Sequence, residues 1–290
     1  MSAGKLILID GMGLLYRSFF AIKELSTSTG IATNAVFGFV RTLDRIKDKW
    51  DPTHWLVVLD GGLPESRLSL LEDYKAQRKP MPDLLRSQVP LVEEYLDAAR
   101  ILRLRVDAQE ADDVIASVAE EAADKSFEVL IASSDKDLYQ LVGNGVCIIS
   151  TTGDYGEMGP REIEEKTGVP PARIVDWLAL TGDAVDNIPG IPGVGPKTAA
   201  KLLLEFGSLD GIWNNIENVH SERLRNLLEE HKDTVERNVK MVKLDSNIDC
   251  GIQLDETRVR QPVHEKLLSF AERLEFESMA RDLRERDLFD

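Results

Sequence analysis

Short, continuous apolar runs alternate along the chain with segments of helical periodicity. The runs occupy residues 5–10, 55–60, 128–131 and 146–150. Runs of this length without polar interruptions are typical of strands that are covered on both faces, as in a parallel sheet. Between them, residues 34–50 and 90–99 place apolar side chains at the spacing of a helix face. The alternation predicts an α/β fold in which a central, mostly parallel sheet is flanked by helices.

The pattern changes near residue 159. Beyond it the chain becomes mostly helical, and glycines and prolines interrupt it between residues 170 and 196. We therefore predict two parts that pack as one body: an α/β core over residues 1–158 and a helical region over residues 159–290.

Charge and cysteine content narrow the function classes. The formal net charge is −16 and the isoelectric point is about 4.8. A uniformly negative surface repels phosphate, so this balance argues against a nucleic-acid partner unless the carboxylates gather where cations neutralise them. Cys147 and Cys250 match no metal-site spacing and are expected to be buried thiols in a reducing cytoplasm. No apolar run is long enough to cross a bilayer, so no membrane partner is expected.

Acidic residues follow three of the predicted strands. Asp10 and Asp60 end their runs directly, whereas Asp135 and Asp137 follow the third run within the sequence Ser-Asp-Lys-Asp. The carboxyl ends of parallel strands form one edge of the sheet, and ligands of open α/β sheets bind in the crevice beyond it. We therefore expect these side chains to lie close together.

Two further acidic motifs have ordinary explanations when each is taken singly. Glu110-Ala-Asp112-Asp113 opens an apolar helix, where acids favour the positive end of the helix dipole. Asp183 and Asp186, in Thr-Gly-Asp-x-x-Asp, fit a loop with a helix cap. Together with the acids that follow the strands, these motifs predict a carboxylate cluster.

A carboxylate cluster needs cations. Packed carboxylates repel one another, and their desolvation is costly unless cations occupy the site. Hard divalent cations such as Mg²⁺ take oxygen ligands and bind phosphate well. Two such ions about 4 Å apart polarise a scissile phosphate, activate water and stabilise the leaving oxygen. The cluster therefore predicts hydrolysis of a phosphate ester with two Mg²⁺ or Mn²⁺ ions.

A glycine-rich hairpin lies between two predicted helices at about residues 173–206. Glycines let the backbone approach a phosphate closely, and a helix N-terminus supplies amide donors. The spacing does not fit a nucleotide P-loop, whose two glycines lie further apart. The form is that of a helix-hairpin-helix, which binds DNA backbones of any sequence; a purely structural hairpin is the alternative. The residues expected to contact DNA are Gly190, Gly193, Gly195, Lys197 and Thr198.

A basic stretch with one aromatic residue is unusual in this acidic chain. It comprises Tyr74, Lys75, Arg78 and Lys79, with Arg67 upstream. One interpretation is that the cations steer phosphate while Tyr74 stacks on an exposed base. The other interpretation, equally weighted, is a solvated helix face. Arg17 follows Asp10 closely in the sequence and is a further cation expected near the carboxylates.

In this order and placement, the motifs resemble those of the 5′ nuclease family, above all the 5′-3′ exonuclease domain at the front of bacterial DNA polymerase I. The matching motifs are Leu-Ile-Asp10-Gly, Val-Val-Leu-Asp60, Tyr74-Lys75, Glu110-Ala-Asp-Asp113, Ser134-Asp-Lys-Asp-Leu-Tyr-Gln-Leu141, Thr181-Gly-Asp-x-x-Asp-Asn187 and Gly193-Val-Gly-Pro-Lys-Thr-Ala199. The resemblance runs from about Leu6 to Arg273-Leu-Glu-Phe276, which is nearly the whole chain. One departure is Ser66-Arg67-Leu68-Ser69, where the family usually has Phe-Arg-His-Glu; it affects the packing of the basic segment and removes no metal ligand.

The resemblance implies a role for each motif. One metal site would be formed by Asp10, Asp60, Glu110 and Asp112, and a second by Asp135, Asp137, Asp183 and Asp186, with Asp113 nearby. Residues 66–95 would form a helical arch over a single-stranded 5′ end, and Lys75, Arg78 and Arg17 would be the catalytic cations. The hairpin is similar to one that holds duplex DNA through a bound K⁺.

The family cleaves DNA phosphodiesters at 5′ flaps, nicks and free 5′ ends during replication and repair. The resemblance therefore implies DNA as the substrate and a DNA polymerase as a partner. We expect the protein to be a monomer in a bacterial cytoplasm, associated with the nucleoid.

Three other function classes fit the residues less well. A DNA-junction binding module with decayed catalysis should have lost some acids, yet all of the expected carboxylates are present. A ribonuclease of the related PIN-like fold usually lacks the glycine hairpin. A phosphatase with an Asp-x-Asp nucleophile fits poorly, because Gly11-Met12 follows Asp10 where a second aspartate would be needed. The balance between exonuclease and flap cleavage stays open.

Overall fold

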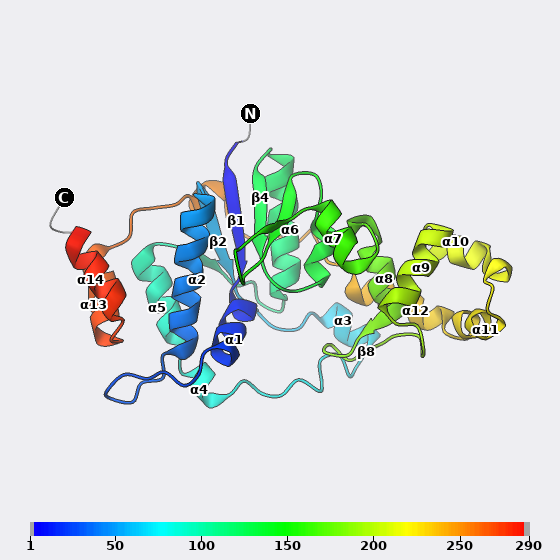
Figure 1. The fold of residues 1–290 in the computed structure, drawn as a ribbon, viewed down its shortest axis with the longest axis horizontal. Coiled ribbons are helices and arrows are strands. Elements are labelled where there is room, and N and C mark those ends of the chain that lie inside the picture. The colour runs from blue at the N-terminus through cyan, green and yellow to red at the C-terminus, as the bar shows by residue number, and fades with distance from the viewer. Residues whose placement is uncertain (1–2, 287–290) are drawn as a thin grey trace.

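The computed structural model of the chain describes residues 3–286, and its centre is a six-stranded sheet (Figure 1). The strand order is β3-β2-β1-β4-β5-β6; β1 to β5 are parallel, and β6 pairs antiparallel to β5. The strands are β1 Lys5–Asp10, β2 His54–Val58, β3 Leu102–Leu104, β4 Glu128–Ala132, β5 Val146–Ile149 and β6 Glu157–Met158. This order confirms the predicted α/β fold class.

The continuous apolar runs are explained by helices on both faces of the sheet. In β1, Leu6 and Leu8 pack toward α6, whereas Ile7 and Ile9 pack toward α1, α2 and α5, and all four side chains are fully buried. Two C-terminal helices extend the second layer, so α2 and α5 lie between the sheet and the end of the chain (Figure 1). The helices are α1 Gly11–Ala21, α2 Asn34–Trp50, α5 Val89–Ala99, α6 Ala111–Asp124, α13 His264–Arg273 and α14 Glu277–Arg286.

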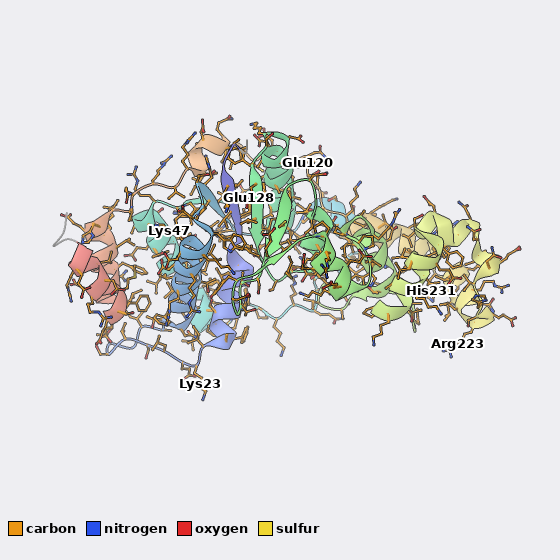
Figure 2. All side chains as sticks on the ribbon, turned by 45° about the horizontal axis from the view of Figure 1, so that its top comes forward. Lys23, Lys47, Glu120, Glu128, Arg223 and His231 are labelled. Carbon is orange, nitrogen blue, oxygen red and sulfur yellow. The ribbon has the colours of Figure 1, made fainter. Side chains whose placement is uncertain are left out.

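The helical region extends from the β6 side of the sheet (Figure 1). Its helices are α7 Pro160–Thr167, α8 Ile174–Thr181, α9 Pro196–Phe206, α10 Leu209–Asn214, α11 Glu222–Glu230 and α12 Lys232–Val242. Arg223 and His231 lie toward its far end, well away from Lys23 and Lys47 (Figure 2). One apolar core runs from β1 through α6 into α8, α9 and α12, so the two parts pack as one body. The boundary expected at residue 158 stays a prediction.

Two segments outside these layers position the site. A short antiparallel pair, β7 Gly182–Asp183 with β8 Ile188–Pro189, follows α8 and leads into the glycine hairpin. The segment expected to form the arch, residues 66–95, contains α3 Glu65–Leu70, α4 Asp83–Arg86 and the first turns of α5, and its residues 71–82 lie outside any helix. Within residues 3–286, no helix combines the length and apolarity of a membrane span.

Candidate active site

Carboxylates from several elements meet at the carboxyl edge of the sheet, as the strand ends predicted. They surround a cavity of about 500 Å³ whose lining includes Asp10, Asp135, Asp183 and Asp186. Asp10 is fixed as the N-cap of α1: its Oδ1 accepts a hydrogen bond from Gly13 N at 2.8 Å, and its Oδ2 accepts one from the Ser133 hydroxyl at 3.0 Å. The fold therefore brings residues distant in sequence to one place.

Asp135 and Asp137 are positioned by the turn after β4. Asp135 N donates to the Ser133 hydroxyl at 3.1 Å, and Asp137 N donates to Asp135 Oδ1 at 2.9 Å. Asp137 Oδ1 is buried and has no hydrogen-bond partner within residues 3–286. Burial, followed by the charges of Asp135, Asp10 and Asp137, raises the pKa of Asp112 well above its usual value. This carboxylate therefore belongs to the same cluster.

Two other predicted metal ligands lie at the start of α6. Asp60 Oδ1 accepts a hydrogen bond from Ala111 N at 3.1 Å, and the Asp60 side chain is exposed. Glu110 is the N-cap of α6 and is buried, with ion pairs to Arg67 and Lys75. Burial would raise the pKa of Glu110, but these two cations outweigh it and lower the pKa. Glu110 is thus held in its charged form.

Arg67 differs from its predicted role as a DNA contact. Its side chain is only 8% exposed, and it forms a bidentate ion pair with Asp113 at 2.6 and 2.8 Å in addition to its pair with Glu110. Its Nε also donates to Met241 O, at the end of α12, at 2.9 Å. A buried guanidinium with these partners cannot reach a DNA phosphate. Arg67 instead fixes Glu110, and because both oxygens of Asp113 face Arg67, Asp113 supports the cluster rather than facing the cavity.

Lys75 and Arg78 lie against the acids, as expected of cations that act at this site. The Lys75 ammonium pairs with Glu110 and, at 3.4 Å, with Asp186 Oδ2; Arg78 pairs with Asp186 Oδ1 at 2.6 Å. Lys75 N also donates to Asp186 O at 3.1 Å, and its φ of 56° lies in the left-handed region. Residues other than glycine adopt this conformation uncommonly, so the hydrogen bond to Asp186 O helps to hold the backbone of Lys75 in a sparsely populated region.

Tyr74, Lys79 and Arg17 differ in how well their positions fit the predicted roles. Tyr74 is 4% exposed, and its hydroxyl donates to Glu110 at 3.1 Å, so the buried ring cannot stack on a base as predicted. Lys79 is exposed and remains available to phosphate. Arg17 does not line the acid cavity: it lies seven residues along α1 from Asp10, and its guanidinium donates to the Thr151 hydroxyl. The expected place of Arg17 among the carboxylates is therefore corrected.

The glycine hairpin presents its backbone to solvent at the start of α9. Gly193 has φ +81° and Gly195 is the N-cap of α9, and open space surrounds both Cα atoms on the side where a Cβ would project. Lys197 is exposed and Thr198 half-buried in the first turn of α9. Gly190 has a packing role, because a Cβ there would lie 2.1 Å from Thr181 O.

The electrostatics of the cluster suit divalent cations. Burial, and then the charges of Asp60 and Asp135, raise the pKa of Asp10 to about 6, although hydrogen bonds oppose the shift. Burial together with Asp135 and Asp183 raises the pKa of Asp137 to about 8. Oxygen-only donors and a buried Asp137 oxygen without a partner fit Mg²⁺ or Mn²⁺. Among the described residues, no three acidic, histidine or cysteine side chains already lie close enough to form a metal cage. Part of the cluster is instead paired with Arg67, Lys75 and Arg78.

Comparisons with known proteins agree with this geometry. Residues 5–168 match the family described as "5'-3' exonuclease, N-terminal resolvase-like domain", and residues 169–265 match "5'-3' exonuclease, C-terminal SAM fold". The 5′-3′ exonuclease of Aquifex aeolicus is 41% identical over 278 residues, which are 96% of this chain and 94% of that protein. The chain belongs to the 5′-3′ exonuclease family.

This exonuclease-family chain is also similar to part of a longer polymerase and to two solved nuclease structures. The thermostable DNA polymerase I of Thermus thermophilus is 37% identical over 96% of this chain, which spans only 33% of that polymerase. The zinc-bound T5 5′-exonuclease has a TM-score of 0.68 at 21% identity, with 97% of this chain and 98% of that chain covered. The catalytic core of Rad2 with a DNA substrate has a TM-score of 0.64 at 17% identity, covering 96% and 92%. At these identities the likeness is one of fold.

Sequence reasoning missed three supporting residues of the exonuclease site. Ser133 links Asp10 to Asp135, and Lys136 pairs with Asp183 at 3.2 Å. Asn238 on α12 is fully buried, and its amide donates to Ala179 O at 3.0 Å and to Pro189 O at 2.7 Å. Ser133 directly precedes the acidic motif after β4 and Lys136 stands inside it, so both could have been found there. Asn238 carries no sequence signal.

The raised pKa values predict how pH affects the metal-free exonuclease domain. An aspartate whose pKa is 3.8 when unfolded and about 6 or about 8 when folded binds more protons in the folded state over that interval. Stability must therefore fall as pH rises from about 4 to about 8. We expect the melting temperature in chelator to fall from pH 5 to pH 8. Because Mg²⁺ displaces these protons, its affinity should rise over the same range.

A matched variant separates the effect of the acid cluster from that of other titrating groups. His54 is one such group: burial lowers its pKa, so its contribution makes stability rise with pH instead of fall. Asp137→Asn should flatten the upper part of the metal-free profile, above pH 6. A melting temperature that does not change with pH in chelator, or the same slope in Asp137→Asn, would contradict the electrostatic description of the cluster. Thermal melts at five pH values, with and without Mg²⁺, measure both effects.

Proposed function

We propose that this nuclease-family chain hydrolyses DNA phosphodiesters at 5′ flaps, nicks and free 5′ ends, in replication and repair. The observation that carries the proposal is the meeting of carboxylates from β1, β4, α6 and the β7–β8 turn beside two cations, Lys75 and Arg78. Acids at this density suit metal ions, and the adjacent cations suit a phosphate. The exposed hairpin supplies a separate surface for duplex DNA.

The acids divide into two sets of proposed metal ligands. Asp10, Asp60, Glu110 and Asp112 would hold one cation, and Asp135, Asp137, Asp183 and Asp186 would hold a second. Mg²⁺ or Mn²⁺ bound there would polarise the scissile phosphate and lower the pKa of the attacking water. Lys75 and Arg78 would donate hydrogen bonds to the non-bridging phosphate oxygens, where negative charge builds up in the transition state.

The hairpin and the partners complete the proposal. The backbone from Gly193 to Gly195, with Lys197 and Thr198, would hold the duplex phosphates, with K⁺ as the bridging ion. The protein would act as a monomer and cooperate with a DNA polymerase. The last point rests on the polymerase I relative of Thermus thermophilus, in which the matching region is one third of a longer chain.

Cleavage of matched DNAs tests the proposal. Single-turnover assays with 5′-labelled flap, nicked, blunt and single-stranded DNAs, with Mg²⁺, Mn²⁺ or chelator, map both the products and the metal requirement. We expect metal-dependent cleavage close to the flap junction, together with trimming of 5′ ends. Binding of flap DNA without cleavage in any metal would favour the second candidate, a junction-binding module.

The hairpin offers a variant with little expected cost to folding. At Gly195, φ is −87° and no atom lies within 4 Å of the point to which a Cβ would project, so Gly195→Val can keep the backbone. The added side chain would nevertheless block the approach of a phosphate. We expect duplex affinity to fall by about tenfold, which is about 1.4 kcal/mol, while affinity for single-stranded DNA and the Mg²⁺ dependence stay at parent values. Unchanged duplex affinity would rule out the hairpin as a duplex clamp.

A further inference from the structure

A buried asparagine on α12 binds two carbonyl groups that are distant in the sequence. Asn238 is fully buried, although the other buried side chains of α12 are apolar. Its Nδ2 donates to Ala179 O at 3.0 Å and to Pro189 O at 2.7 Å, so both amide protons have acceptors. An apolar side chain at this position would leave both carbonyls without these donors. The amide therefore does more than fill space in the core.

The two carbonyls flank the segment that carries two of the proposed metal ligands. Ala179 lies in the last turn of α8, where carbonyl groups have no partner within the helix, and Pro189 ends β8. Between them, Asp183 ends β7 and Asp186 lies in the turn before β8. Asn238 therefore ties both ends of the β7–β8 turn to α12.

The base of the β7–β8 turn is rigid because backbone packs directly against backbone. A Cβ at Gly182 would overlap Gly190 N, so no side chain separates the two strands at this point. Within the turn, Val185 N donates to Asp183 Oδ1 at 2.7 Å. A displacement at the ends of this segment is therefore passed on to its carboxylates.

The end of α12 is held by a second side-chain amide. Gln140 lies in the 3₁₀ helix η1 Asp137–Leu141, which directly follows the other acidic turn. Its Nε2 donates to Asp137 O at 2.9 Å and to Val242 O, in the last residue of α12, at 3.0 Å. Its Oε1 accepts a hydrogen bond from Leu244 N at 3.0 Å. Gln140 therefore joins the segment that positions Asp137 to the helix that Asn238 joins to the β7–β8 turn.

Helix α12 thus connects the two halves of the proposed second set of metal ligands. The halves are the turn after β4 and the β7–β8 turn, which supply Asp135 with Asp137 and Asp183 with Asp186. Figure 1 shows α12 beside α8, which leads into the β7–β8 turn. The two amides hold α12 one helical turn apart, at Asn238 and Val242. Since ligand distances in a metal site are kept within about 0.2 Å, the separation of the two turns has to be fixed.

We propose that Gln140 and Asn238 are positioning residues of the proposed second cation site, because they hold the two acidic turns at a fixed separation through α12. The proposal rests on the proposed function, in which both turns supply ligands to one cation. Removal of a partner that orients metal ligands typically lowers metal affinity by about 10- to 100-fold. Loss of either amide should therefore weaken the second site and leave the proposed first site, which includes Asp60 and Glu110, at its parent affinity.

Titration of the full chain with Mg²⁺ by calorimetry tests the proposal without cleavage. The variants are Asn238→Leu, Gln140→Met and the double variant, which remove the amides but keep side chains of similar size. Each single variant should weaken one class of Mg²⁺ site by about tenfold or more and leave the other class unchanged. Because both amides act through one helix, the double variant should bind Mg²⁺ about as weakly as the weaker single variant. Losses that add in the double variant, or an equal loss at both classes of site, overturn the proposal.

Amide hydrogen exchange in chelator gives a second readout that needs no metal. Val185 N and Asp137 N report on the two turns, since each donates to the aspartate side chain two residues before it. Asn238→Leu and Gln140→Met should each speed exchange at both amides by about two- to tenfold, the range for loss of one hydrogen bond. The reason is that each turn restrains the other through α12. Variants that loosen only their own turn overturn the proposal.

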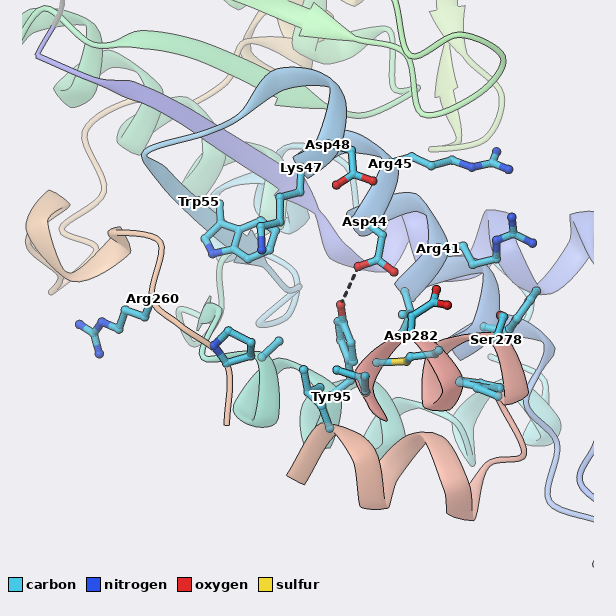
Figure 3. A pocket seen from close by; sticks show the side chains of 18 residues that line it. Arg41, Asp44, Arg45, Lys47, Asp48, Trp55, Tyr95, Arg260, Ser278 and Asp282 are labelled. Atoms are coloured by element: carbon cyan, nitrogen blue, oxygen red, sulfur yellow. Dashed lines mark hydrogen bonds between the residues drawn. The ribbon is translucent and has the colours of Figure 1, made fainter. Parts of the chain in front are cut away.

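Two control variants produce similar losses away from these links. Tyr95→Phe removes a hydrogen bond on the other face of the sheet, where the Tyr95 hydroxyl donates to Asp44 Oδ1 at 3.4 Å. Figure 3 shows this pair in a cavity of about 550 Å³ between α2, α5 and the C-terminal helices. Val235→Ala removes apolar contacts from α12 itself. Both controls should keep parent Mg²⁺ affinity at both classes of site. Equal weakening of one class in Val235→Ala and Asn238→Leu, at an equal loss of melting temperature, would trace the effect to general stability and overturn the proposal.

The two readouts keep the proposal separate from the proposed function. If the parent binds no Mg²⁺, the proposed function fails, and exchange in chelator still decides whether α12 connects the two turns. If Asn238→Leu does not fold, Gln140→Met decides alone: unchanged exchange at Val185, together with parent Mg²⁺ affinity, would overturn the proposal.

Discussion

Asp10→Asn is expected to abolish cleavage while it raises the melting temperature of the metal-free protein. The change removes one negative charge from a buried cluster in which the pKa of Asp10 is already raised to about 6. Asparagine can still cap α1 through Oδ1 and can donate to the Ser133 hydroxyl, so the local structure should persist. The loss of a metal ligand should lower the single-turnover rate by roughly 10³-fold or more, equivalent to several kcal/mol of charge stabilisation.

The prediction for Asp10→Asn is specific because the cleavage rate should fall while the melting temperature of the metal-free protein should rise. Each kcal/mol of relieved repulsion corresponds to an increase of about 2–4 °C in melting temperature for a protein of this size class. DNA affinity should be kept or increased, because phosphate meets less negative charge. Asp124→Asn, at the exposed end of α6, is the matched control and should change neither rate nor stability. Near-parent turnover of Asp10→Asn at saturating Mg²⁺ would show that Asp10 is not a metal ligand.

The second large effect is expected for Lys75→Ala. In the metal-free protein, the Lys75 side chain is only 8% exposed, and its ammonium neutralises Glu110 and Asp186. Burial would lower its pKa, but these two carboxylates outweigh burial and raise it, so Lys75 stays charged. If this cation stabilises the phosphate in the transition state, its loss should lower the single-turnover rate by roughly 10²-fold, more than it lowers affinity.

Stability supplies an independent readout for Lys75. Removal of one partner from a buried ion pair leaves the other charge uncompensated, which typically costs about 3–5 kcal/mol. Lys75→Ala should therefore melt at a lower temperature in chelator, and Mg²⁺ should restore much of the loss. Arg78→Ala, whose side chain is half exposed, should mostly weaken binding of substrates with a free 5′ strand. If both variants cleave and bind like the parent, the contacts of this segment are structural only.

The meeting of the acids could be predicted from sequence because the end of a buried strand is visible in the local pattern of apolar residues. A run such as residues 5–10 predicts a buried strand, and a parallel sheet then places its terminal Asp10 beside Asp135, which lies 125 residues away in sequence. The hairpin could be predicted for the same reason, since glycine and proline act locally on the backbone. Strands of two or three residues, such as β3 and β6, carry too little pattern to be predicted.

The cations were harder to predict because a charged side chain gives no local signal of its burial. Arg67 and Tyr74 both stand in a stretch that a sequence describes equally well as a solvated face, yet both side chains are buried against Glu110. Their burial depends on α6 and α12, which come from other parts of the chain. Arg17 has the same difficulty: its closeness to Asp10 in the sequence predicted a place near the acids, but Thr151, after β5, provides its partner.

The buried Arg67 side chain limits how the protein can be divided. It joins the segment after β2 to the start of α6 and to the backbone at the end of α12, which belongs to the other family-defined part of the chain. A fragment that ends at residue 168 would lose the Met241 carbonyl and the helix that shields this guanidinium, and water would enter beside Glu110 and Asp113. We therefore expect the two regions recognised by sequence to fold together, and neither half to keep an ordered acid cluster when expressed alone.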